Sequence, residues 1–91
     1  SWMADMRARL DAAARELDTH LRAAGPTIVG GTALFRLVET PMAVHVQATL
    51  ARHGIAVRRF PGDAKHLRIG IPPDAESRDR LLAGVRAALA S

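Results

Sequence analysis

Apolar residues recur every three or four positions along the first two dozen residues of the chain. This spacing places them on one side of a helix, with the polar residues on the other side. The apolar set is Met3, Met6, Leu10, Ala13, Leu17 and Leu21. Gly25 and Pro26 then end the helix, because glycine suits a left-handed cap and proline cannot continue a helix. The pattern predicts a helix over Trp2–Ala24, with its methionines and leucines in the core.

Four later stretches change to the alternating pattern of short strands. They are Thr27–Gly30, Ala33–Val38, Ile55–Phe60 and His66–Ile71. Turn-forming residues separate the two members of each pair: Gly31 and Thr32 in the first, and Pro61, Gly62 and Asp63 in the second. The pattern therefore predicts two pairs of strands.

Two further helices are predicted from their end signals. Thr40 is a suitable N-cap, Pro41 suits the first helical position, and Gly54 suits the end of the helix. Val44 and Val46 alternate with polar neighbours and taken alone would also suit a strand, but the cap residues favour a helix. The last helix opens after Pro72, Pro73 and Asp74, and its apolar stripe is Leu81, Leu82, Val85 and Leu89.

The predicted order is therefore α-β-β-α-β-β-α in one domain over residues 1–91. Three amphipathic helices need one shared apolar sheet face to bury their stripes. We expect an α+β two-layer sandwich, with the helices on one face of a small, mainly antiparallel sheet. The other face of the sheet is then left uncovered.

The composition of the chain argues against nucleic acid as a binding partner. The 91 residues carry a formal charge of +4 and no cysteine, and Lys65 is the only lysine among thirteen basic residues. Several arginines follow an acidic residue by four positions, as Arg22 follows Asp18, which is typical of a solvated helix surface. With only Trp2, Phe35 and Phe60 as aromatics, a base-stacking face is not expected, and we expect no nucleic-acid partner.

The chain shows no targeting or membrane signal. Asp5, Arg7 and Arg9 interrupt any apolar run at the start, and nothing approaches the roughly 18 apolar residues of a membrane span. We expect a cytoplasmic protein with no membrane partner.

Strand alternation assigns three arginines to the uncovered face. If Leu67, Ile69, Ile55 and Val57 face the core, then Arg68 and Arg58 face outward, and Arg36 joins them if Phe35 and Leu37 face inward. A guanidinium matches carboxylate and phosphate, so neighbouring arginines could hold a doubly anionic ligand. They could equally be ordinary solvated residues. Leu34, Val38 and Phe60 share this predicted face and would need a covering partner.

No residue set predicts catalysis by this chain alone. The four histidines lack metal-ligand spacing, the serines lack a neighbouring base, and Lys65 falls in a predicted turn. We therefore predict no catalytic, cofactor-binding or metal-binding residue here.

Taken together, VGGTALFRLV (29–38), HGIAVR (53–58) and HLRIG (66–70) resemble a known family. They look like the C-terminal small domain of class I/II aminotransferase-fold enzymes, which use pyridoxal phosphate. The match covers nearly the whole chain in the right order. Within the superfamily it looks closest to the threonine-phosphate decarboxylases of cobalamin biosynthesis, and histidinol-phosphate aminotransferases are near relatives.

The resemblance implies a substrate-binding role for two residues. Arg68 would bind the α-carboxylate, and Arg58 would help to hold the anionic, often phosphorylated, end of the substrate. Arg36 has no matching role. Many aminotransferase relatives have Asn-Phe where this chain has Leu34-Phe35, which favours the decarboxylase branch.

The resemblance also implies what this segment lacks. The large domain, with the lysine that holds pyridoxal phosphate, would precede it, and the intact enzyme would be a homodimer acting on a phosphorylated amino acid. This chain alone would bind no cofactor and would be inactive. The alternatives are a histidinol-phosphate-type aminotransferase domain and a free-standing, non-catalytic anion-binding module.

Overall fold

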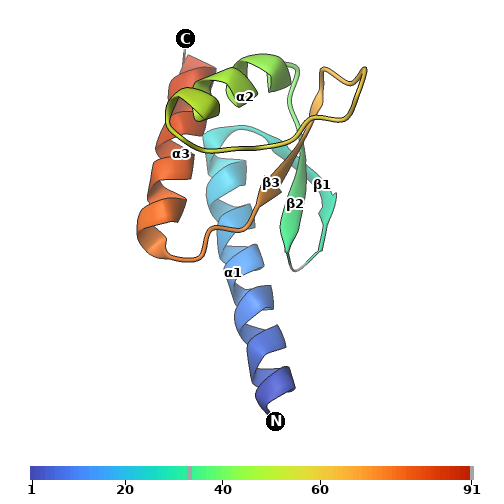
Figure 1. Ribbon diagram of the computed structural model, residues 1–91, viewed down its shortest axis with the longest axis vertical. Coiled ribbons are helices and arrows are strands. Elements are labelled where there is room, and N and C mark those ends of the chain that lie inside the picture. The colour runs from blue at the N-terminus through green and yellow to red at the C-terminus, as the bar shows by residue number, and fades with distance from the viewer. Residues whose placement is uncertain (33, 91) are drawn as a thin grey trace.

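Three helices and a three-stranded sheet make up the computed structural model, which describes residues 1–32 and 34–90 (Figure 1). The elements in chain order are α1 (Trp2–Ala24), β1 (Thr27–Gly31), β2 (Phe35–Glu39), α2 (Ala43–Arg52), β3 (His66–Gly70) and α3 (Ala75–Ala90). The strands lie in the order β1-β2-β3, and both pairs are antiparallel. Ala33, where the second strand was expected to begin, lies outside the described residues.

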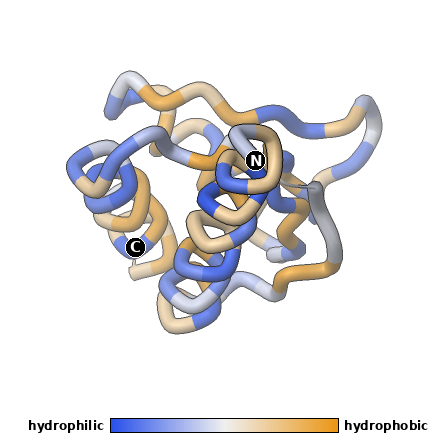
Figure 2. The backbone as a smooth tube through the Cα atoms, turned by 90° about the horizontal axis from the view of Figure 1, so that it is seen from below, coloured by the Kyte–Doolittle hydropathy of each residue, from blue (hydrophilic) through white to orange (hydrophobic). Residues whose placement is uncertain are grey.

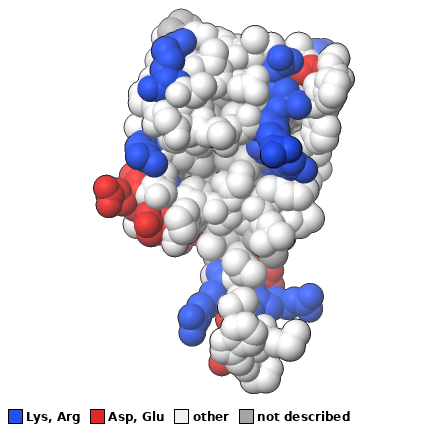
Figure 3. Space-filling model, in the orientation of Figure 1, with Lys and Arg blue, Asp and Glu red and all other residues white. Residues whose placement is uncertain are grey.

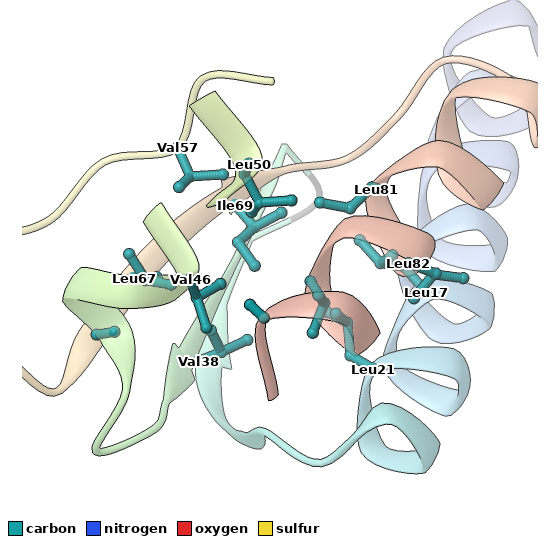
Figure 4. Packing of buried hydrophobic residues seen from close by; sticks show 13 residues of the cluster. Leu17, Leu21, Val38, Val46, Leu50, Val57, Leu67, Ile69, Leu81 and Leu82 are labelled. Atoms are coloured by element: carbon teal, nitrogen blue, oxygen red, sulfur yellow. The ribbon is translucent and has the colours of Figure 1, made fainter. Parts of the chain in front are cut away.

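The core lies between the helices and one face of the sheet, as predicted (Figure 4). Leu17 and Leu21 of α1, Val46 and Leu50 of α2, and Leu81, Leu82 and Val85 of α3 pack with Val38, Leu67 and Ile69 of the sheet. In the tube of Figure 2, hydrophobic and hydrophilic residues alternate around the helices, as amphipathic helices require. The α+β two-layer architecture is confirmed.

The predicted end of α1 and start of α3 are confirmed, whereas the predicted start of α2 is wrong. Gly25 has a φ of 132°, and its N–H donates to the carbonyl oxygens of Leu21 and Arg22. Asp74 accepts a hydrogen bond from the N–H of Ser77 at the start of α3. Thr40 was expected to be the N-cap of α2, with Pro41 at its first position, but α2 begins at Ala43 with Met42 as its N-cap. The hydroxyl of Thr40 instead accepts from the N–H of Met42 and stabilises the turn before the helix.

α2 and α3 approach each other closely at Gly84. A Cβ atom at this position would lie 2.6 Å from Cδ2 of Leu50. A side chain here would displace the end of the fully buried Leu50 side chain, so glycine allows the two helices to pack closely.

The predicted strand Ile55–Phe60 is wrong. Within it a single isolated bridge, between Arg58 and Arg68, joins the segment to β3. The flanking backbone bonds outside the sheet: the carbonyl oxygen of Val57 accepts from the side chain of Gln47, and the N–H of Ile55 donates to the carbonyl oxygen of Leu50. The order is therefore α-β-β-α-β-α.

The predicted facing of the second strand is also wrong. Val38 is fully buried, and it shares the helix-covered face with Arg36, whereas Phe35 and Leu37 are only partly buried. Both faces of Leu34–Val38 carry large apolar residues, so alternation alone could not choose between them. The choice depends on a partner for Arg36 on the helical side.

That partner is Asp18 of α1. Nε and Nη2 of Arg36 lie 2.7 and 2.9 Å from the two carboxylate oxygens of Asp18, and Nη1 donates to the carbonyl oxygen of Thr32. Asp18 was expected to pair with Arg22 on its own helix. Its pairing with Arg36 instead joins α1 to the β1–β2 hairpin, and both side chains are largely buried.

The first turns of α1 lie outside the core. Met3 is 75% exposed and Met6 44% exposed, so the prediction that these methionines are core contacts is wrong. Figure 1 shows why: the N-terminal half of α1 projects beyond the sheet and the other helices. The apolar stripe therefore continues along α1 past the surface that it covers.

We predict that Asp18→Ala lowers the free energy of unfolding by about 2 kcal/mol, because it leaves the Arg36 guanidinium largely buried without its charged acceptor. Urea denaturation followed by circular dichroism measures this change. Asp11→Ala is the matched control, because Asp11 is an exposed carboxylate on the same helix. Equal midpoints for the two variants would contradict the prediction.

Candidate anion-binding site

Arg58 and Arg68 lie side by side, as the sequence predicted. The N–H of Arg58 donates to the carbonyl oxygen of Arg68 at 3.1 Å, and the N–H of Arg68 donates back at 2.8 Å. Residues paired in this way project to the same side of a sheet. Because Leu67 and Ile69 point into the core, both arginine side chains leave the sheet on the uncovered face.

The ring of Phe35 packs against the guanidinium group of Arg68. The Cζ atom of Arg68 lies 5.2 Å from the centre of the Phe35 ring, a cation–π contact. Phe35 was expected to face inward, and its place on the uncovered face is a correction. Alternation missed it because Phe35 and Val38 are both apolar and lie on opposite faces.

A cavity of about 220 Å³ opens beside the two arginines. Among the described residues it is lined by Arg58, Arg59, Phe60 and Arg68. Figure 3 shows Lys and Arg side chains gathered on the side of the molecule where Figure 1 places the turn before β3. Arg59 is bonded to Gln47 and to the carbonyl oxygen of Asp63, so Arg58 and Arg68 are the lining arginines whose side chains suit an anion with several oxygen atoms.

Hydrogen bonds to α2 and to the next turn hold the segment that carries Arg58. The side-chain amide of Gln47 donates to the carbonyl oxygen of Val57 at 3.2 Å and accepts from Nε of Arg59 at 2.8 Å. Nη1 of Arg59 donates to the carbonyl oxygen of Asp63. The sequence analysis singled out neither Gln47 nor Arg59, and the doublet Arg58-Arg59 was the one available signal.

Asp63 closes the turn that leads from this segment into β3. Its carboxylate accepts from the N–H groups of Lys65 and His66, and Nδ1 of His66 lies 2.7 Å from Oδ2. These contacts lower the pKa of Asp63 below its usual range, the hydrogen bond from Lys65 contributing most. The other ring nitrogen of His66 lies 3.5 Å from a carboxylate oxygen of Glu39.

The other candidates lie elsewhere. Arg36 is engaged with Asp18 on the opposite face, which corrects its predicted place. Lys65 is exposed in the turn and is not among the residues lining the cavity. Within residues 1–32 and 34–90, no group of three acidic or histidine side chains is arranged to hold a metal ion. Over the same residues, no helix has the length and apolar character needed to cross a bilayer.

The sequence of the chain is similar to part of two known proteins. The chain is 43% identical over 65 residues to a threonine-phosphate decarboxylase from Sinorhizobium sp, and 40% identical over 73 residues to a threonine-phosphate decarboxylase from Pseudomonas aeruginosa. These matches cover 71% and 80% of the chain but only 20% and 22% of the two relatives. No protein-family model matches the chain.

A solved structure shows the same fold. It is the crystal structure of a protein from Burkholderia pseudomallei named "putative aminotransferase", with a TM-score of 0.74 and 32% sequence identity. The match covers 88% of this chain and 25% of that protein. The resemblance predicted from the sequence is confirmed: the chain is homologous to a segment of threonine-phosphate decarboxylases and has the fold of part of an aminotransferase-like protein.

We predict that the turn closed by Asp63 opens at low pH. Because the folded state lowers this pKa, the contribution to stability is present above the ordinary value of about 3.9 and is lost as the pH falls through the lower, folded value. NMR titration of the Lys65 and His66 amide shifts should show a step below pH ~3.9. Asp63→Asn should remove the step, and its persistence in that variant would assign it to another carboxyl group.

Proposed function

We propose that this chain is the substrate-anion-binding domain of a pyridoxal-phosphate-dependent enzyme that acts on a phosphorylated amino acid. Decarboxylation of threonine phosphate is the reaction we favour. The observation that carries the proposal is the pair Arg58 and Arg68, bridged backbone to backbone beside one cavity. Homology to two threonine-phosphate decarboxylases supports it.

The two arginines take separate roles in this proposal. Arg68, on a regular strand and stacked on Phe35, binds the α-carboxylate, for which a fixed and directional partner is needed. Arg58, on an irregular segment at the edge of the sheet, binds the phosphorylated end. Holding the substrate at both ends fixes its orientation, and orientation determines which bond to the α-carbon is placed to break.

The cofactor belongs to the rest of the enzyme in this proposal. Pyridoxal phosphate, when bound, supplies the electron sink for the bond that breaks. The residues present here do not fit it, because the one lysine, Lys65, is exposed in a turn away from the lining of the cavity. The contribution of this chain is to bind the substrate and orient it.

A large domain like that of the relatives is the proposed partner, in a homodimeric and cytoplasmic enzyme. This chain spans only about a fifth of the length of the two decarboxylases. Phe60, which lines the cavity, is 44% exposed, Leu34 just before β2 is 71% exposed, and Trp2 and Met3 are more than two-thirds exposed on α1. We assign these apolar side chains to the contact with that domain. Val38, expected among them, is fully buried in the core.

Activity of a chimera tests the arginine roles. We would join this chain to the Pseudomonas aeruginosa relative in place of its matching 73-residue segment and assay decarboxylation of threonine phosphate. Arg68→Ala should lower kcat/KM by about 30-fold, or ~2 kcal/mol, since it leaves the substrate carboxylate without its partner. Arg52→Ala, which changes an exposed arginine on α2, is the matched control.

Two outcomes would overturn parts of the proposal. An active chimera with unchanged kinetics in Arg68→Ala would rule out the carboxylate role. Transamination without decarboxylation would assign the chain to the aminotransferase alternative, which the structural relative from Burkholderia pseudomallei favours.

We predict that the isolated chain self-associates through its exposed apolar residues, because nothing in the described part of the chain covers Leu34 and Phe60. Sedimentation velocity should show concentration-dependent oligomers for the wild type. The double variant Leu34→Glu and Phe60→Glu should associate more weakly than the wild type, since of the side chains assigned to the large domain only Trp2 and Met3 remain. Val44→Glu, at a half-exposed apolar position on α2, is the control and should associate as the wild type does.

A further inference from the structure

Arg58 carries a proposed binding group, but it lies on a segment that is not a strand and has a single bridge to β3. Such segments usually adopt many conformations. We infer that Gln47 of α2 is the positioning residue that fixes the direction of the Arg58 side chain, an inference that rests on the proposed anion-binding role of Arg58.

The contacts of Gln47 lie on either side of Arg58. Its amide nitrogen donates to the carbonyl oxygen of Val57, and its amide oxygen accepts from Nε of Arg59. One side chain therefore holds the residue before Arg58 and the residue after it. A side-chain amide supplies both a donor and an acceptor from one neutral group.

Arg68 holds the same segment from the opposite edge. Both backbone groups of Arg58 are bonded to the backbone of Arg68, at 3.1 and 2.8 Å. Val57 and Arg59 are thus directed to α2, and Val57 is buried there. Successive side chains of an extended segment point in opposite directions, so Arg58 points away from α2, and it lines the cavity.

The position of Gln47 is itself well determined. Its neighbours on α2, Val46 and Leu50, are among the most buried residues of the protein. The bond from Arg59 to the carbonyl oxygen of Asp63 extends the same contact into the following turn. Gln47 therefore connects the core to the one irregular segment of the site.

The experiment compares Gln47→Leu with the wild-type chain. Leucine has a similar size and no charge, so the variant removes both hydrogen bonds without changing the formal charge of the chain. Arg52→Gln, on the same helix and outside the cavity, is the matched control. Amide hydrogen exchange is measured at Arg58 and Arg68, and inorganic phosphate is titrated by NMR as the probe anion.

Gln47→Leu should speed exchange of the Arg58 and Arg68 amides by about tenfold, while the amides of α3 exchange as in the wild type. If the binding-competent direction of Arg58 then falls to about a fifth of the population, phosphate affinity should fall about fivefold. Arg52→Gln should change neither quantity. Equal protection of the bridge amides in Gln47→Leu and wild type would overturn the inference, whatever the phosphate titration gives.

Arg58→Ala separates this inference from the proposed function. If Arg58→Ala binds phosphate as the wild type does, the anion-binding role fails, even where Gln47→Leu loosens the bridge. If Arg58→Ala loses phosphate affinity and Gln47→Leu retains it, the anion-binding role stands and the positioning role fails. If faster exchange in Gln47→Leu extends to the amides of α3, the role of Gln47 is global stability and the inference is wrong.

Discussion

Burial of one sheet face under three helices is the constraint on which the rest of this structure depends. A three-stranded sheet offers little apolar surface, and α1, α2 and α3 all use the same side of it. The inward positions of β3 are therefore occupied by Leu67 and Ile69, and Arg68 between them has no alternative to the uncovered face. The chemistry of the site follows from how the core is packed.

The packing of the core also leaves arginine side chains close together on the uncovered face. Arg58, Arg59 and Arg68 lie around one cavity, and the described residues that line it include no acid. Neighbouring cations repel each other, and the ring of Phe35 offers Arg68 only a modest compensation. An anion in the cavity would relieve this repulsion. Arg36 shows the contrasting case, in which an arginine has a carboxylate partner within the fold and serves structure alone.

Sequence reasoning was most accurate where local chemistry decides the outcome. The bounds of α1, the cap at Gly25, the order of the helices and the adjacency of Arg58 and Arg68 were all predictable from spacing and end signals. It failed where a residue far away along the chain determines the local structure. The facing of β2 depends on Asp18, eighteen residues before Arg36, and the path of residues 57–59 depends on Gln47. Met3 and Met6 have helical spacing, but spacing does not show where the covered surface ends.

The irregular segment between Gly54 and Lys65 can vary in length independently of the sheet. Because this stretch contributes only one bridge to the sheet, residues could be added to or removed from its exposed turn without changing the register of any strand. Arg58 and Arg68 would stay bridged while the length of the turn after Phe60 changed. The turn beside the cavity can therefore change in length with the core sequence unaltered.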